Sequence, residues 1–305
     1  MMRRKISICI CFCLLAGVLF GCSKDKPNTS PTPDKKQEGM VTPSPTPKPI
    51  KNPEGDTVSG RFNPPTGYVR VASEAGSFAA FLQSHPLKED GAPVLLFDGT
   101  ERADAPQAAV LRLDISKTSN QQGPRALVRL RAEYLFAAGQ TSQINYQFLS
   151  GFVFPFDKWC EGYRVEVDGK KVEWVLKDSP ANDYAVLLSY LNTLFAYSNT
   201  SSLRAELQAV ADIQAGDIFI NGEAGAVMVM DVARAESTGE VVFLLAQSPS
   251  PTQEIYILNN SADSAISPWY SASDLPPLVT PTGSFTMEDL RRFNELPTGE
   301  APAAD

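Results

Sequence analysis

The chain has 305 residues, a formal net charge of −8 at pH 7, a single histidine and 24 prolines. An acidic chain lacks the basic face that nucleic-acid phosphates require, so these numbers exclude a nucleic-acid partner. One imidazole cannot build a metal centre of several histidines, and a Ser-His-Asp or Cys-His hydrolase would depend entirely on His85. Hydrophobic residues make up 43% of the chain, which is ordinary for a globular protein with a buried core.

The first 22 residues have the pattern of a bacterial lipoprotein signal. A basic segment, Met1 to Lys5, precedes the apolar run Ile6 to Phe20, and Gly21-Cys22 is followed by an abruptly polar segment. The apolar run is shorter than the roughly 20 residues that span a bilayer, and its length suits a secretory signal. We therefore expect an exported protein in which residues 1–21 are removed and Cys22 carries lipid. That lipid would anchor it to the outer face of the cell membrane or to the outer membrane. The alternative is an uncleaved N-terminal anchor.

Residues 22–60 are rich in Pro, Ser, Thr and Lys and contain no aromatic residue. Such a composition cannot bury enough apolar surface to offset the entropy of ordering, and its prolines favour an extended chain. We predict a disordered tether over 22–60, a globular domain over 61–293 and a disordered tail over 294–305. A recognition motif for a proline-binding partner is the alternative interpretation of the tether. Beyond the predicted signal the chain has only Cys22 and Cys160, so we expect no internal disulfide.

The hydrophobic pattern between residues 61 and 293 predicts one α+β domain with a central, mostly antiparallel sheet and packed helices. Helices are predicted over 76–83, 122–138, 184–197, 202–210 and 287–293. Strands are predicted over 93–97, 109–114, 144–148, 163–167, 172–176, 217–220, 226–231 and 241–247. The clearest helix is 122–138, where Leu127, Leu130 and Tyr134 recur at helical spacing.

Several runs resemble a known family and occur in its order. They are Pro65–Tyr68, Ser77–Leu82, Arg129–Leu135, Gly216–Ile220, Leu245–Ser248 and Pro268–Tyr270. These runs are similar to the bacterial lipoprotein family of domain of unknown function 4846, and the likeness covers about residues 61–293. The resemblance implies a lipid-anchored envelope protein and carries little stated function.

A second likeness is to the papain-like NlpC/P60 cell-wall peptidases. Members of the domain of unknown function 4846 family typically place a Cys near the start of the helix that begins here at Gln122, and a His just before the strand 226–231. That arrangement resembles the papain-like peptidases. A helix N-terminus lowers the pKa of a thiol, and a nearby imidazole takes its proton. The matching positions here are Gly123 and Gly225. The resemblance therefore implies a papain-like pseudoenzyme whose cleft has lost its nucleophile and its base.

Other residues offer weaker candidates for chemistry. Cys160 and His85 lie on segments away from those two glycines, and we interpret them as a packed thiol and a surface-loop imidazole. Asp114, Asp217 and Asp231 stand at predicted strand ends, where carboxylates can act as acid and base. With 35 acidic residues in the chain such placements are expected by chance.

An aromatic pair and a glycine-rich run are two further candidates for ligand binding. Trp269 and Tyr270 either line a sugar or peptide site or pack in the core or at its rim. The glycine-rich run 221–225 has no predicted helix after it, so it is not a phosphate-binding loop. We expect no catalytic residue, metal or cofactor.

We interpret the chain as a non-catalytic, lipid-anchored domain that binds cell-wall peptide or glycan. The candidate cleft residues are Gln122, Gly123, Asp217, Gly225, Gln247 and Tyr270. One alternative is an envelope amidase or peptidase that uses residues not identified from the sequence. The other is an accessory subunit of an envelope complex.

The signal pattern makes a direct prediction about Cys22. Substituting Cys22→Ala removes the sulfur that would carry the diacylglycerol, so the protein should appear in the soluble exported fraction or as uncleaved precursor. Cell fractionation and mass spectrometry of the N-terminus measure this. An unmodified Cys22 in membrane-bound mature protein would contradict the prediction.

Overall fold

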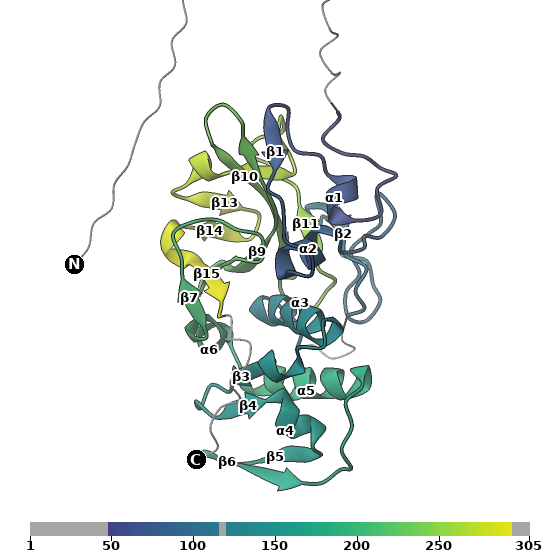
Figure 1. The fold of residues 1–305 in the computed structure, drawn as a ribbon, viewed down its shortest axis with the longest axis vertical. Coiled ribbons are helices and arrows are strands. Elements are labelled where there is room, and N and C mark those ends of the chain that lie inside the picture. The colour runs from purple at the N-terminus through teal and green to yellow at the C-terminus, as the bar shows by residue number, and fades with distance from the viewer. Residues whose placement is uncertain (1–47, 116–119, 295–305) are drawn as a thin grey trace, which may run out of the picture. The chain divides into compact units, whose positions relative to one another are not determined.

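Two long, almost wholly buried strands, β9 (Gly225–Ala235) and β10 (Val241–Gln247), form the centre of the large sheet (Figure 1). They pair antiparallel, with Val242 opposite Ala233 and Ala246 opposite Met228, and the register shifts between Leu244 and Leu245. Both faces of these strands are covered, which explains why their sequences are nearly continuous apolar runs. The computed structural model describes residues 48–115 and 120–294. The expected signal, Cys22, most of the tether and all but the first residue of the tail lie outside these described residues.

The large sheet is antiparallel in every pairing. Its order is β2-β11-β10-β9-β8-β15-β7, while β1 also pairs with β9 and β12 with β10. The remaining strands of this sheet are β1 (Tyr68–Arg70), β2 (Gln107–Val110), β7 (Leu207–Ala209), β8 (Ile218–Asn221), β11 (Tyr256–Leu258), β12 (Trp269–Ser271) and β15 (Leu290–Phe293). Together with the packed helices, this sheet confirms the predicted α+β fold.

Alternate residues of β9 and β10 supply two cores, one on each face of the sheet. Met228 and Leu244 belong to the core that the helices cover. Val229 and Phe243 belong to a second core, which includes Leu278 of β13 (Leu278–Thr280). The hairpin of β13 with β14 (Gly283–Phe285) contributes to this second face.

Six α-helices lie among the described residues. They are α1 (Val58–Arg61), α2 (Phe78–Gln83), α3 (Pro124–Ala137), α4 (Phe156–Cys160), α5 (Tyr184–Tyr197) and α6 (Thr200–Ala205). The predictions of long helices over 122–138 and 184–197 are confirmed by α3 and α5. Helix α3 packs against β9 and is buried on most of its surface. None of the described helices is long and apolar enough to cross a membrane.

Two further hairpins lie beside α5. They are β3 (Asn145–Gln147) with β4 (Val153–Pro155), and β5 (Tyr163–Asp168) with β6 (Lys171–Leu176). The Phe154 ring stacks on Tyr190 of α5, with centroids 4.5 Å apart, and on Trp174 of β6 at 5.2 Å. This aromatic stack fixes the β3–β4 hairpin against the helix.

The C-terminal helix predicted over 287–293 is wrong. Residues Met287–Asp289 form a short 3-10 turn, and β15 follows directly and pairs with both β8 and β7. The predicted helix over 202–210 likewise ends at Ala205, and the chain continues into β7. In both places the chance to pair with an open sheet edge outweighs the local helical spacing of the apolar residues.

Other differences concern the N-terminal part of the domain. The predicted strand over 93–97 makes only isolated bridges, at Leu95 and Leu96. Residues before the expected boundary at 61 also pack into the fold, since Lys51 bridges Phe62 and Val58 is fully buried. The proline-rich composition of the residues before 61 predicts disorder, but a few apolar contacts with the domain order the described residues 48–60.

His85 is buried, with 6% of its surface exposed, so the expectation of a surface-loop imidazole is wrong. Its ring lies edge-on to Phe81, with centroids 5.4 Å apart. Neither ring nitrogen has a hydrogen-bond partner within the described part of the chain. Burial therefore lowers the pKa of His85 to about 4.

This burial predicts acid lability. A base whose pKa is lower in the folded state opposes folding once it must be protonated, so stability falls as the pH drops from about 6.5 towards 4. The loss is on the order of 3 kcal/mol. Urea unfolding of the native chain and of His85→Leu between pH 7 and 4 measures it. The carboxylates shared by both chains cancel in the difference, so identical pH profiles would contradict the prediction.

Candidate functional site

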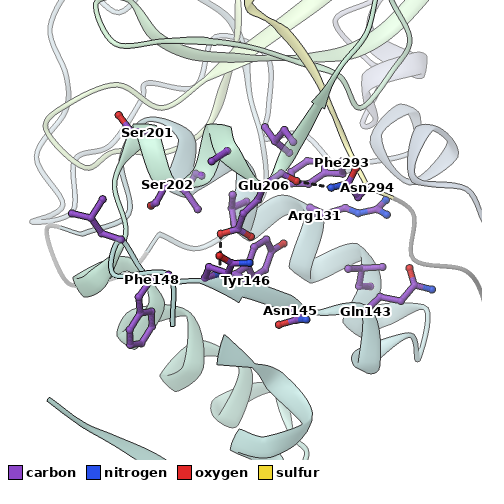
Figure 2. Close-up of a pocket in the computed structure, with 18 residues that line it drawn as sticks. Arg131, Gln143, Asn145, Tyr146, Phe148, Ser201, Ser202, Glu206, Phe293 and Asn294 are labelled. Carbon is purple, nitrogen blue, oxygen red and sulfur yellow. Dashed lines mark hydrogen bonds between the residues drawn. The ribbon is translucent and has the colours of Figure 1, made fainter. Parts of the chain in front are cut away.

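A cavity of about 570 Å³ opens between α3, α6, β3 and the end of β15 (Figure 2). It combines amide, hydroxyl and aromatic side chains with one carboxyl and one guanidinium. The lining residues are Val128, Arg131, Leu135, Gln143, Asn145, Tyr146, Gln147, Phe148, Leu149, Gly151, Ser201, Ser202, Leu203, Ala205, Glu206, Leu207, Phe293 and Asn294. Its volume is within the usual range for ligand pockets, about 300–1,000 Å³.

Glu206 is held firmly in the wall of this cavity. It is the C-cap residue of α6, and its backbone carbonyl accepts a hydrogen bond from Asn294 Nδ2 at 2.8 Å. Its Oε1 accepts from the backbone N–H of Gln147 at 2.8 Å. Gln147 lies on β3, which pairs with β4 along one edge. The Glu206 carboxyl accepts the Gln147 N–H on the edge of β3 that faces away from β4. The second oxygen, Oε2, has no hydrogen-bond partner within the described ranges.

The protonation of Glu206 is set by burial. Loss of solvent raises the pKa of its carboxyl to about 7, and the hydrogen bond from Gln147 opposes that rise only in part. Near neutral pH the protonated and ionised forms are therefore present in comparable amounts. A strongly shifted carboxyl in a cavity is a recognised mark of a functional group.

Arg131 of α3 and Tyr146 of β3 line the same cavity as Glu206, as Figure 2 shows. The Arg131 guanidinium lies 4.8 Å from the ring centroid of Phe78 and 5.6 Å from that of Phe293. Burial raises the pKa of Tyr146, the positive charge of Arg131 lowers it and the negative charge of Glu206 raises it. The Tyr146 hydroxyl is thus within electrostatic reach of both charges.

The amide groups of the cavity include an unsatisfied one. Gln143, Asn145 and Asn294 all line it. The Oδ1 atom of Asn145 is buried and has no donor within residues 48–115 and 120–294. A buried acceptor without a donor is unfavourable by about 1–3 kcal/mol.

The structure brings Gly123 and Gly225 to the same end of the sheet. The N–H of Gly123, at the start of α3, donates to Ser248 O at 2.6 Å. Ser248 directly follows β10, and the neighbouring strand β9 begins at Gly225. A Cβ on either glycine would meet no atom within 4 Å, yet their φ angles are +58° and +82°. There is open space at both positions, but the local backbone favours glycine.

The remaining sequence candidates lie apart from the cavity. Gln122 is half-buried beside Gly123. Asp217 is buried and pairs with Arg292, with Oδ1 2.6 Å from Nε. Burial raises the pKa of Asp217 and the Arg292 hydrogen bond opposes the rise.

The other two aspartates do not form a pair with Asp217. Asp231 is fully buried. Its carboxylate accepts hydrogen bonds from Arg70 Nε at 2.6 Å and from Gln83 Nε2 at 2.8 Å. Asp114 is exposed. The buried two therefore neutralise separate guanidinium groups, which is a structural role.

Gln247 and Tyr270 are buried and hydrogen bonded inside the fold. Gln247 Nε2 donates to the Tyr256 hydroxyl at 2.8 Å, and its Oε1 accepts from Thr282 Oγ1 at 2.9 Å. The Tyr270 hydroxyl donates to the backbone carbonyl of Asn259 at 2.8 Å. Trp269 is fully buried as well. These contacts support core packing for the aromatic pair.

The single described thiol is not activated. Cys160, at the end of α4, is half-buried, and burial raises its pKa to about 11. His85 follows α2 and is buried, with its pKa lowered to about 4. Among the residues that the structure describes, no group of three or more His, Cys, Asp or Glu side chains is able to hold a metal ion.

Glu206 was missed by the sequence analysis. The predicted helix over 202–210 places Glu206 inside a helix, where an acidic residue is typical of the solvent-exposed face. The local signal available was a negative charge at a helix C-terminus, where the helix dipole disfavours it. Its burial depends on β3 and β15, which are distant in the chain, so no local pattern reports it.

A family model described as domain of unknown function (4846) matches residues 58–292. Comparison with the curated proteins and with the solved structures found no match for the chain.

The shifted carboxyl predicts a stabilising substitution. An acid whose pKa is higher in the folded state opposes folding when ionised, so the penalty begins above about pH 4.5 and is complete above pH 7. Glu206→Gln keeps an oxygen for the Gln147 N–H and removes the charge. We expect it to raise the free energy of unfolding at pH 8 by about 2 kcal/mol, allowing for partial solvent access.

Urea unfolding at pH 4.5 and pH 8 measures this effect. The gain should shrink towards zero at pH 4.5, where the native carboxyl is largely protonated. Glu223→Gln, at an exposed site outside the cavity, is the matched control and should change little at either pH. A Glu206→Gln chain no more stable than the native one at pH 8 would show that the carboxyl is well solvated.

Proposed function

We propose that this chain, which belongs to the family of domain of unknown function 4846, is a lipid-anchored, envelope-exposed domain that binds cell-wall peptide or glycan without cleaving it. The description of the family states no activity, so the proposal depends on the residues of the chain. The lipoprotein pattern at Cys22 supports the anchor, and the proline-rich segment after it supports a tether that reaches the cell wall.

The lining of the cavity is the observation that carries the binding role. Gln143, Asn145 and Asn294 offer amide groups, and the largely buried Tyr146 and Phe148 contribute to the apolar walls. Peptides and sugars present amide or hydroxyl groups on an apolar frame, and proteins bind such frames through this mixture of side chains. The supporting feature is therefore a concave site in which a few polar groups are held within apolar walls.

The same lining favours binding over cleavage. Glu206 is the one carboxylate among the described residues of the cavity, whereas glycoside hydrolysis ordinarily uses two. The positions that resemble the Cys and His of the papain-like peptidases carry Gly123 and Gly225. A ligand in this cavity would meet hydrogen-bonding groups and no thiol with its base.

A second candidate is an envelope hydrolase in which Glu206 acts as general acid or base. The observation that favours it is the pKa of about 7, which is close to the ideal for proton transfer at neutral pH. This candidate predicts product release from cell-wall fragments by the native chain and its loss in Glu206→Gln.

A retention assay with the full chain and purified cell-wall fragments tests the proposal. Ala205 and Ala137 are each exposed at the last residue of a helix, but only Ala205 lines the cavity. Ala205→Trp should narrow the cavity and weaken retention at least tenfold, whereas Ala137→Trp should leave it unchanged. Failure of the native chain to retain any fragment, or equal retention by both variants, would contradict the proposed site.

A further inference from the structure

Two hydrogen-bond acceptors on residues that line the cavity have no donor among the described residues. Oε2 of Glu206 has no donor within the described residues, and Asn145 Oδ1 is buried without one. Both side chains line the cavity, from α6 and from β3. A ligand group that pairs with the free oxygen of Glu206 must therefore carry an N–H or O–H donor.

The fold does not require a charge at Glu206. The structural tasks of this residue are to accept the Gln147 N–H at 2.8 Å and, through its backbone, to accept from Asn294. A glutamine would perform both and would avoid the desolvation of an anion. Features that lower stability and have no structural purpose are typical of functional sites.

The charged and titratable groups around Glu206 leave it as the negative centre of the cavity. Arg131 faces the cavity from α3, Tyr146 from β3, and Tyr190 of α5 also senses the Glu206 charge. On the other packed elements the arginines have their own partners. Arg204 Nε of α6 donates to Ile220 O at 3.1 Å, and Arg292 of β15 pairs with Asp217.

The geometry selects one kind of donor. A guanidinium binds a carboxylate best through both oxygens at once, and here it would have to share Oε1 with the backbone N–H of Gln147. An ammonium group is compact and needs only one free carboxylate oxygen to form a charged hydrogen bond, so Oε2 alone is enough for it. The net charge of −8 also attracts cations towards the protein.

We propose that Glu206 binds the primary ammonium group of an amine-bearing peptide as a carboxylate and releases its own proton to solvent on binding. This inference rests on the proposed function and names the group that the cavity recognises. The bound state is a hydrogen-bonded ion pair between Oε2 and the ammonium. No covalent bond forms or breaks.

The proposal has a definite pH dependence. Pairing with a cation favours the ionised carboxyl, so its pKa falls in the complex. At pH 7 binding should release about half a proton, and affinity should rise about tenfold between pH 6 and pH 8. A protonated carboxyl that donates to a sugar or amide oxygen would have the opposite sign, with affinity falling as the pH rises.

Calorimetric titration of the full chain with the peptide N-acetyl-L-Ala-γ-D-Glu-L-Lys, whose single amine is on the lysine side chain, and with the same peptide acetylated on that amine as well, tests this proposal. Acetylation should weaken binding at least tenfold. Glu206→Gln should bind both peptides equally weakly and lose the pH dependence, whereas Glu223→Gln should behave as the native chain. Thermal unfolding of each variant confirms that it is folded.

Each outcome separates this inference from the proposed function. Equal affinity for the two peptides, or affinity that falls from pH 6 to pH 8, overturns the ammonium assignment and leaves peptide binding intact. Binding of 1,5-diaminopentane that depends on Glu206, with no binding of cell-wall fragments or peptides, supports the ammonium site and contradicts the proposed function. Absence of binding by the peptide and the diamine alike overturns the inference.

Discussion

The antiparallel pairing of β9 with β10, buried on both faces, is the constraint on which the rest of the structure depends. Because side chains alternate along each strand, this pair must be covered on two sides, by helices on one and by the β13–β14 hairpin on the other. Helix α3 packs against β9 and carries Arg131 into the cavity. The position of the candidate site therefore follows from the burial of this central pair.

The cavity is built where three distant segments meet around α3. The β3–β4 hairpin is fixed on α5 by the stack of Phe154 on Tyr190, and α6 then leads the chain to β7. Glu206 stands at that transition, tied to β3 through Gln147 and to the end of β15 through Asn294. These contacts shield the carboxyl from water, which is the physical origin of its raised pKa.

The buried carboxylates of this protein illustrate two uses of the same chemical group. Asp217 and Asp231 each pair with an arginine, so their charges are compensated within the fold. Among the described residues, Glu206 has one donor, the backbone N–H of Gln147 on Oε1, and its Oε2 has none. The difference separates side chains that hold the structure together from one that is left available to a ligand.

Local spacing was enough to determine α3, α5, the strands β5 and β6 and the α+β class, because apolar periodicity acts within a few residues of the chain. The family likeness could also be recognised from the sequence, and it is confirmed over residues 58–292. Only the tertiary structure decided that residues 290–293 form a strand, that His85 is buried and that Glu206 lines a cavity. Each of these depends on partners far away in the sequence, whose sheet edges and packing surfaces no local pattern contains.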